Sequence, residues 1–156
     1  MSSIAARLEE LGIVLPTPVA PIANYVPYVR TGNMLIISGQ LPLGSDGKLA
    51  PAHIGKLGPD SSIEAPREAA RLCAINLLAQ AKAALGDLDS ITRVVRLGGF
   101  FNVASEFASL PQAMNGASDL MAAFFGERGR HARTTVGVAH LPLNALAEVE
   151  ALFEVA

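Results

Sequence analysis

The chain has 156 residues, of which 51% are hydrophobic and 17% are charged, and its formal net charge at pH 7 is −2. This length and composition predict a single domain, residues 1–156, and exclude a disordered chain. The basic residues form no cluster and there is no tryptophan, so nucleic acid is not an expected partner. No apolar run reaches the ~18 residues of a membrane helix, and the expected location is cytoplasmic.

The first third of the chain predicts an extension followed by two strands. Residues 1–16 form the N-terminal extension, in which Ser3 can cap a short helix before several prolines favour an extended chain. Residues 25–30 and 34–38 are typical of two strands joined by a tight turn. Residues 51–61 contain glycine, proline and histidine and predict a long loop, a candidate lid or rim of a site.

The rest of the chain alternates helices and strands. Helices are predicted at residues 62–85 and 110–125, each followed by a glycine. Strands are predicted at 91–103, 131–138 and 147–153. The order β-β-α-β-α-β-β, with only two long helices, indicates an α+β fold in which both helices cover one face of a mixed sheet.

The last two strands are expected to pair as a hairpin across the turn at 141–144. Side chains alternate between the two faces of a strand, so the apolar or β-branched set of each strand should face the helices. That set is Thr134, Val136, Val138, Val149, Ala151, Phe153 and Val155. Arg133 and Glu148 would then emerge together on the other face, where a site or a subunit interface would lie.

Two sequence blocks carry a family resemblance. Residues 24–42 contain Asn-Tyr-Val, Gly-Asn and Ser-Gly-Gln-Leu-Pro, and residues 132–142 read Ala-Arg-Thr-Thr-Val-x-Val-x-x-Leu-Pro before a Val-Glu strand. Both blocks resemble the Rid/YjgF family of reactive-intermediate imine deaminases, also called endoribonuclease L-PSP. The spacing of 15 residues between Arg133 and Glu148 matches that between the substrate-binding arginine and catalytic glutamate of this family. The resemblance covers roughly residues 17–156.

The resemblance implies a chorismate-mutase-like fold and a homotrimer, in which three sheets close a central barrel and each cleft between subunits holds a site. It implies Glu148 as the catalytic residue and Arg133, Tyr25, Thr135 and Ser118 as substrate-binding residues. A guanidinium binds a carboxylate through two parallel hydrogen bonds, and a glutamate can position water and move protons. The implied reaction converts enamine or imine acids of the 2-aminoacrylate or 2-iminopropanoate type to 2-keto acids and ammonia.

No cofactor is required by this chemistry, and no metal site is predicted, because the three histidines lack metal-ligand spacing. Cys73 is the single cysteine and sits in a helical pattern, which favours an inert buried thiol. The expected partners are a small carboxylate-bearing imine or keto acid and further copies of the chain.

Two other functions stay open at this point. One is a non-catalytic trimeric protein that binds small keto acids through Arg133, for example in a stress response. The other is the translation-inhibitor or endoribonuclease label of the family, against which stand the missing basic track and the lack of a histidine pair suited to RNA cleavage. Arg133 and Glu148 could also form only a cross-strand ion pair.

Overall fold

The computed structural model describes residues 3–156, so the first two residues of the expected extension lie outside it. The elements follow the expected order, with one short helix in front. They are α1 Ile4–Glu10, β1 Tyr28–Thr31, β2 Met34–Gln40, α2 Glu64–Leu85, β3 Ile91–Asn102, α3 Leu110–Phe125, β4 Ala132–Val138 and β5 Ala147–Val155. Short 3₁₀ turns lie in the connections between these elements, at Pro51–His53, Leu88–Ser90, Gly126–Gly129 and Pro142–Asn144. In the described part of the chain, none of the helices is long and apolar enough to cross a membrane.

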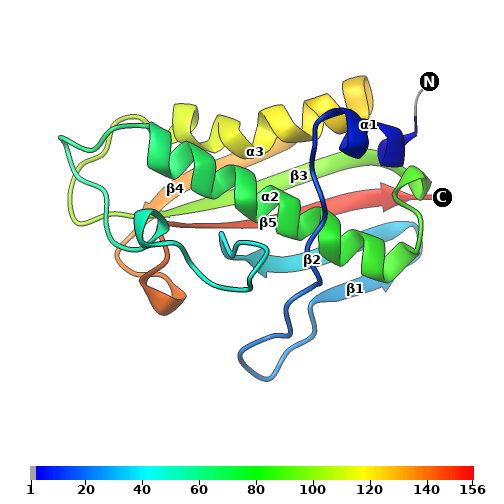
Figure 1. The fold of residues 1–156 in the computed structure, drawn as a ribbon, viewed down its shortest axis with the longest axis horizontal. Helices are drawn as coiled ribbons and strands as arrows, with labels where there is room; N and C mark the ends of the chain where they lie inside the picture. Colours follow the sequence, from blue (N-terminus) through cyan, green and yellow to red (C-terminus); the bar gives the residue numbers. More distant parts are fainter. Residues whose placement is uncertain (1–2) are drawn as a thin grey trace.

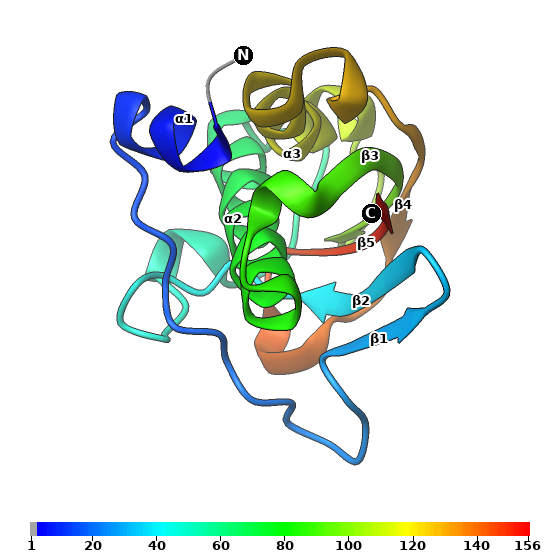
Figure 2. The ribbon, with the colours of Figure 1, turned by 90° about the vertical axis from the view of Figure 1, so that its right-hand side faces the viewer.

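The strands form one mixed sheet in the order β1-β2-β5-β3-β4. Only β3 and β4 run parallel, and all other neighbours are antiparallel. Helices α2 and α3 lie side by side on one face of the sheet, and no helix within residues 3–156 covers the other face (Figures 1 and 2). Phe101, Phe124 and Phe153 are the largest side chains of the core between the two layers. The predicted α+β architecture with both helices on one face is confirmed.

The predicted hairpin of the last two strands is wrong. β3 lies between them and pairs with β4 on one side and with β5 on the other. Two features explain this arrangement. A strand, a helix and a strand in succession, here β3-α3-β4, favour a parallel pair with a helical crossover. The connection from β4 to β5 is also longer than the two-residue loop of a tight hairpin.

The predicted faces are right for β5 and reversed for β4. Val149, Phe153 and Val155 of β5 are buried against the helices. In β4, however, Arg133 is in register with Leu97 of β3, whose side chain is in the core, so Arg133 faces the helices as well. Val136 lies on the outer face and is 40% exposed. The register with β3 decides the face, and it leaves the more apolar side of this edge strand on the outer face of the sheet.

Glycine allows the two long helices to approach each other closely. A Cβ atom on Gly116 of α3 would lie 2.0 Å from the carbonyl oxygen of Arg67 in α2. The sequence pattern makes Gly116 look like an interruption of the helix, but its lack of a side chain is what permits this contact. The helix pair is thereby held tightly over the sheet.

The N-terminal segment crosses the helical layer. Ser3 caps α1 by accepting a hydrogen bond from the backbone N–H of Ala6 at 3.1 Å, as predicted. After α1 the chain runs extended across α2 and then enters β1 (Figure 1). The side chain of Gln80 in α2 donates a hydrogen bond to the carbonyl oxygen of Val19 at 3.0 Å. This bond attaches the extended segment to the helix.

The long loop 51–61 packs against the loop before β5. The N–H of Gly55 donates to the carbonyl oxygen of Asn144, and the N–H of Leu146 donates to that of His53. The ammonium of Lys56 reaches the side-chain oxygen of Asn102 at 2.8 Å and also the carbonyl oxygen of Ala139. These bonds hold the two loops together at one end of the sheet.

Candidate functional site

Glu148 lies on β5 and points to the outer face of the sheet, as predicted. It sits beside an irregularity in β2, where the pairing with β5 shifts between Ile37 and Gln40. A Cβ atom on Gly39 would lie 2.4 Å from Oε2 of Glu148, so only glycine leaves room for this carboxyl group. The Ser-Gly-Gln motif therefore has a steric role, because it lets the glutamate lie directly against the β2 backbone.

The environment of Glu148 favours its protonated form. Burial raises the pKa of the Glu148 carboxyl above its ordinary value, and the neighbouring Glu150 carboxylate raises this pKa further. No hydrogen bond from residues 3–156 to the Glu148 carboxylate opposes this increase. A carboxyl group whose pKa is moved towards neutrality is suited to accept and return protons.

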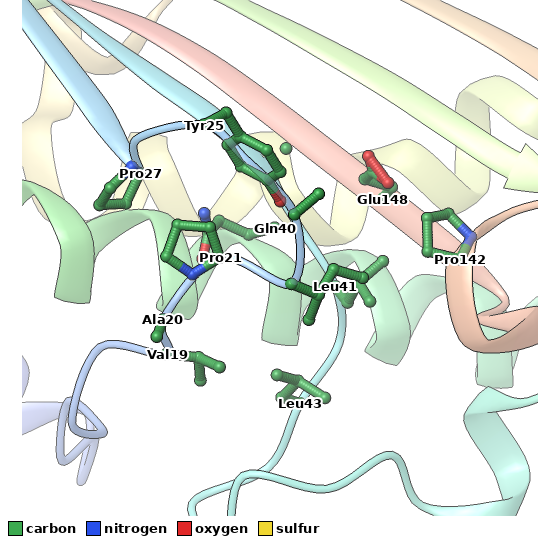
Figure 3. A pocket seen from close by; sticks show the side chains of 13 residues that line it. Val19, Ala20, Pro21, Tyr25, Pro27, Gln40, Leu41, Leu43, Pro142 and Glu148 are labelled. Carbon is green, nitrogen blue, oxygen red and sulfur yellow. The ribbon is translucent and has the colours of Figure 1, made fainter.

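A cavity of about 380 Å³ opens beside Glu148. Tyr25 and Glu148 lie at one end of the view in Figure 3, and Val19 and Leu43 lie at the other. Tyr25 is 49% exposed and lines the cavity, so it is placed where a ligand of Glu148 could contact it. The remaining lining residues are Ala20, Pro21, Ile22, Ala23, Pro27, Gly39, Gln40, Leu41 and Pro142. We call this cavity and its lining the Glu148 pocket.

Arg133 is held by helix α3 through three hydrogen bonds. Its Nη1 donates to Oδ1 of Asn115 at 2.8 Å and to Oγ of Ser118 at 3.1 Å, and its Nη2 donates to the carbonyl oxygen of Pro111 at 3.0 Å. A guanidinium carries five N–H donors, so two remain for a ligand, the number that a carboxylate can accept side by side. The position of the guanidinium is thus set before any ligand arrives.

His131 completes this group of polar side chains. Its Nδ1 lies 2.6 Å from the carbonyl oxygen of Gly129, and its Nε2 lies 2.9 Å from Oγ of Ser118. Burial lowers the pKa of His131, the Arg133 charge adds to the decrease, and the hydrogen bond to Gly129 opposes it. In the neutral ring, Nδ1–H donates to Gly129, and Nε2 accepts the hydroxyl proton of Ser118. Ser118 is then oriented to accept from Arg133.

We call Arg133, Asn115, Ser118 and His131 the Arg133 cluster. It lies apart from the Glu148 pocket within one chain. Glu148 is in register with Phe100 of β3, which is in register with Val136 of β4, three residues beyond Arg133. With ordinary strand spacings, the Cα atoms of Arg133 and Glu148 are about 14 Å apart, and their side chains occupy opposite faces. The prediction that both emerge together on one face of a hairpin is wrong.

The other predicted residues divide between the two regions. Ser118 belongs to the Arg133 cluster and Tyr25 to the Glu148 pocket. Thr135 is two positions after Arg133 on the same face, and its hydroxyl is buried without a hydrogen-bond partner among residues 3–156. Asn115 and His131 also belong to the Arg133 cluster, although neither was predicted as a site residue. The spacing of Asn115 and Ser118 on one helix face, and of His131 and Arg133 on one strand face, was the available signal.

The residues described here offer no ready metal site. No group of three or more histidine, cysteine, aspartate or glutamate side chains within residues 3–156 could hold a metal ion. Cys73 is buried, and its burial raises the pKa of the thiol, with the Glu148 carboxylate adding to the increase. A thiol that stays protonated is a poor nucleophile and a poor metal ligand, in agreement with the predicted inert role.

Comparison with known proteins identifies the class of protein. A family model described as "YjgF/chorismate_mutase-like, putative endoribonuclease" matches residues 5–155. This match spans nearly the whole chain, and the chain belongs to the YjgF family. The resemblance inferred from the two sequence blocks is confirmed.

Similar proteins cover the chain almost completely. Protein TCP17 of Trypanosoma cruzi is 47% identical over 152 residues, which are 97% of this chain and 93% of that protein. The crystal structure of Atu1372 from Agrobacterium tumefaciens, a protein of unknown function, shares 49% identity with a TM-score of 0.88, covering 98% of this chain and 92% of that one. A "putative endoribonuclease" from Shewanella oneidensis shares 38% identity with a TM-score of 0.93, covering 99% and 100%.

A more distant structure shares the fold and carries a small ligand. It is TdcF of E. coli with bound serine, at 23% identity and a TM-score of 0.62, covering 92% of this chain and 96% of that one. At this identity the likeness shows the fold alone.

Proposed function

We propose that this protein hydrolyses reactive imine acids, and the enamine acids that tautomerise to them, to 2-keto acids and ammonia. In this reaction the oxygen of one water forms a bond to the imine carbon. The carbon–nitrogen bond then breaks, nitrogen leaves as ammonia, and the carbon becomes the carbonyl of the keto acid. No electrons are transferred to another molecule, so the reaction needs no redox cofactor.

The observation that carries the proposal is the environment of Glu148. Its carboxyl group is half-buried, has a raised pKa and lies at the wall of a cavity large enough for a small organic acid. As a carboxylate it accepts a proton from the attacking water, and as the acid it returns a proton to the departing nitrogen. A raised pKa keeps both forms populated closer to neutral pH than for a free glutamate.

Arg133 supplies the complementary function of holding the substrate carboxylate. Its two remaining N–H donors lie on the same face of β4 as the hydroxyl of Thr135, which has no hydrogen-bond partner among residues 3–156. Holding the carboxylate fixes the neighbouring imine carbon, which accelerates the reaction by positioning. A substrate spanning from the Arg133 cluster to Glu148 is impossible within one chain, because the two side chains lie on opposite faces of the sheet.

We infer that the site is completed by a second subunit in a homotrimer. The outer face of the sheet exposes large apolar side chains that a partner would cover, namely Val29 at 48%, Ile36 at 47% and Val136 at 40%. Arg96 and Glu150 form an ion pair with a 3.7 Å separation on the same face. In a closed ring with head-to-tail contacts, the Arg133 cluster of one subunit meets the Glu148 pocket of the next.

The direct test compares Glu148→Gln with Glu154→Gln. Both residues lie on the outer face of β5, and Oε1 of Glu154 accepts a hydrogen bond from Thr92, which a glutamine oxygen can also accept. Glu148→Gln is expected to lower imine turnover by about 10²-fold or more, the usual scale for a lost acid–base group. Glu154→Gln is expected to retain wild-type turnover. The assay generates the imine with an amino-acid oxidase and measures the rate of ammonia release above the spontaneous rate.

A second candidate function is supported by the Arg133 cluster alone. Its guanidinium is already oriented by three hydrogen bonds, so it could hold a keto acid without any reaction. If wild type and Glu148→Gln both leave imine decay at the spontaneous rate, while keto acids still bind in an Arg133-dependent way, the deaminase proposal fails and the binding function stands.

A further inference from the structure

The geometry points to an apolar subsite in the Glu148 pocket that selects imine acids with an apolar side chain of several carbons, and to the N-terminal segment 19–25 as one of its walls. This inference rests on the proposed function and names its substrate class. A substrate of this class places its imine carbon at Glu148 and its side chain in the part of the pocket furthest from that carboxyl group.

The size of the cavity exceeds what a three-carbon acid needs. It measures about 380 Å³, and a water molecule in the liquid occupies about 30 Å³, so the cavity has room for on the order of ten heavy atoms. A three-carbon imine acid has only a methyl group to place there once its carboxylate is held by Arg133. Most of the space would then be filled by water in contact with apolar walls.

The chemistry of the walls changes along the pocket. The carboxyl group of Glu148 and the hydroxyl of Tyr25 lie at one end, and the side chains of Val19 and Leu43 lie at the other (Figure 3). The amide of Gln40 is bound within the protein, because its Nε2 donates to the carbonyl oxygen of Ser38 at 2.9 Å. Far from Glu148, the lining therefore offers little to a polar side chain and a suitable surface to an apolar one.

Two buried amides of α2 hold both walls in place through the backbone. Gln80 donates to the carbonyl oxygen of Val19 at 3.0 Å. Asn76 donates to the carbonyl oxygens of Leu41 and Leu43 at 3.0 and 2.9 Å. Asn76 and Gln80 are one helical turn apart and only 5% and 2% exposed. Because the backbone carries these bonds, the side chains of Val19 and Leu43 are free to shape the pocket.

The expected discrimination follows from the value of a methylene group in an apolar pocket, about 10-fold to 200-fold in kcat/KM for a well-enclosed site. The Glu148 pocket is partly open, as the 66% exposure of Ile22 shows. We therefore expect the leucine-derived imine to be hydrolysed with a kcat/KM about 10-fold higher than the alanine-derived imine. A serine-derived imine, with a polar side chain, should gain nothing over the alanine-derived one.

The experiment measures this leucine-to-alanine ratio in wild type and in variants of the pocket. Leu43→Trp fills the apolar end and should reduce the ratio to about one. Ile22→Glu places a charge on the wall formed by segment 19–25, and because Ile22 is largely exposed, this variant should fold even if Leu43→Trp does not. Val14→Trp and Val14→Glu are the matched controls, since Val14 is 87% exposed in the same extended segment but does not line the pocket. Both controls should keep the wild-type ratio.

Binding of the corresponding keto acids is measured in parallel by calorimetry. The inference is overturned if wild type hydrolyses both imines equally well, or if the preference survives both pocket variants. In that case Glu148-dependent turnover of the alanine-derived imine would still support the proposed function. If no imine is hydrolysed, the proposed function fails, and the calorimetric preference for the longer keto acid alone decides whether the apolar subsite exists.

Discussion

The Glu148 pocket and the Arg133 cluster hold their charged groups in opposite ways. Arg133 makes three hydrogen bonds to α3, and its neighbour Ser118 is in turn oriented by His131. Glu148 lies between a glycine backbone and a largely apolar cavity, and the charged neighbour that raises its pKa, Glu150, has the same sign. The Arg133 cluster fixes the position of a permanent positive charge. The Glu148 pocket destabilises a carboxylate charge that protonation removes.

This difference matches two different tasks. A group that holds a carboxylate benefits from a fixed guanidinium, since the cost of ordering it is met before the ligand binds. A group that transfers protons benefits from a pKa close to the working pH, which burial and a like charge provide. Neither region suffices alone for imine hydrolysis, and they lie on opposite faces of one sheet.

The largest expected effect comes from mixing chains that each lack one region. Glu148→Gln and Arg133→Ala should each reduce imine turnover to a few per cent or less. Isolated as mixed trimers, they should recover about a third of wild-type turnover, because in a head-to-tail ring each site draws Glu148 and Arg133 from adjacent chains. A ring of three that contains both variants has an intact pair at about one site in three.

The mixed trimers are isolated with two different affinity tags, and each parent alone is the control. If the mixed trimers turn over imine no faster than either parent, Glu148 and Arg133 of one site do not come from adjacent chains. The proposal of a site shared between subunits is then wrong. A mass of one chain by light scattering at micromolar concentration would remove the shared site as well.

A smaller loss is expected from Arg133→Lys. An ammonium cannot present two parallel N–H donors, and a charge-assisted hydrogen bond contributes about 1.5–3 kcal/mol. Keto-acid affinity should therefore fall about 10-fold to 100-fold by calorimetry, with the fold retained. Arg71→Lys is the matched control, because Arg71 pairs with Glu68 on the surface of α2 and belongs to neither the Arg133 cluster nor the Glu148 pocket. Unchanged affinity in Arg133→Lys would make Arg133 a structural residue.

Two glycines separate the stability of the fold from the geometry of the site. In Gly116→Ala the new Cβ meets the Arg67 backbone, which cannot move without separating the helices, and a loss of about 1–3 kcal/mol in unfolding free energy is expected. In Gly39→Ala it meets only the end of the Glu148 side chain. Unfolding in urea should then change little, but turnover should fall about 10-fold because the carboxyl group is displaced. Equal stability losses in both variants would contradict this distinction.

The sequence predicted the elements better than their neighbours. Both long helices and the alternating pattern of β5 were found because their apolar periodicity is strong, and the Ser3 cap because its chemistry is local. The partner of β4 was missed. Its more apolar side, which includes Thr134 and Val136, lies on the exposed outer face, so the pattern indicated the wrong face and did not reveal that the register with β3 turns Arg133 towards α3.

The candidate site was predicted residue by residue, but its geometry was not. Motifs identified Tyr25, Arg133 and Glu148, yet motif spacing carries no information about which faces of the sheet they occupy. The hydrogen bonds that link Arg133 to Asn115 and Ser118, and Ser118 to His131, depend on how α3 packs over β4. The apolar pocket depends on the path of an extended segment that has no periodic pattern to predict it.

The smallest expected effect concerns the stability cost of Glu148 itself. The pKa of Glu148 is raised in the folded protein, so the folded state holds its proton to a higher pH than the unfolded chain. The stabilisation from that proton is fully present below the ordinary glutamate pKa and is lost as the pH rises through the folded pKa. At neutral pH the charged carboxyl therefore opposes folding, and Glu148→Gln, which carries no charge, should be slightly more stable than wild type. Because the group is half-exposed and solvent reduces the effect, a Tm increase of about 1–2 °C at pH 7.5 is expected.

Below pH 4 the Tm difference should vanish, since wild-type Glu148 is then neutral in both states. Calorimetric scans at the two pH values measure this difference, and Arg133→Lys, which removes no titrating group in this range, should show no such pH dependence. A Tm of Glu148→Gln below wild type at pH 7.5 would show that the Glu148 carboxylate is stabilised by its surroundings, contrary to the environment that makes it suited to proton transfer.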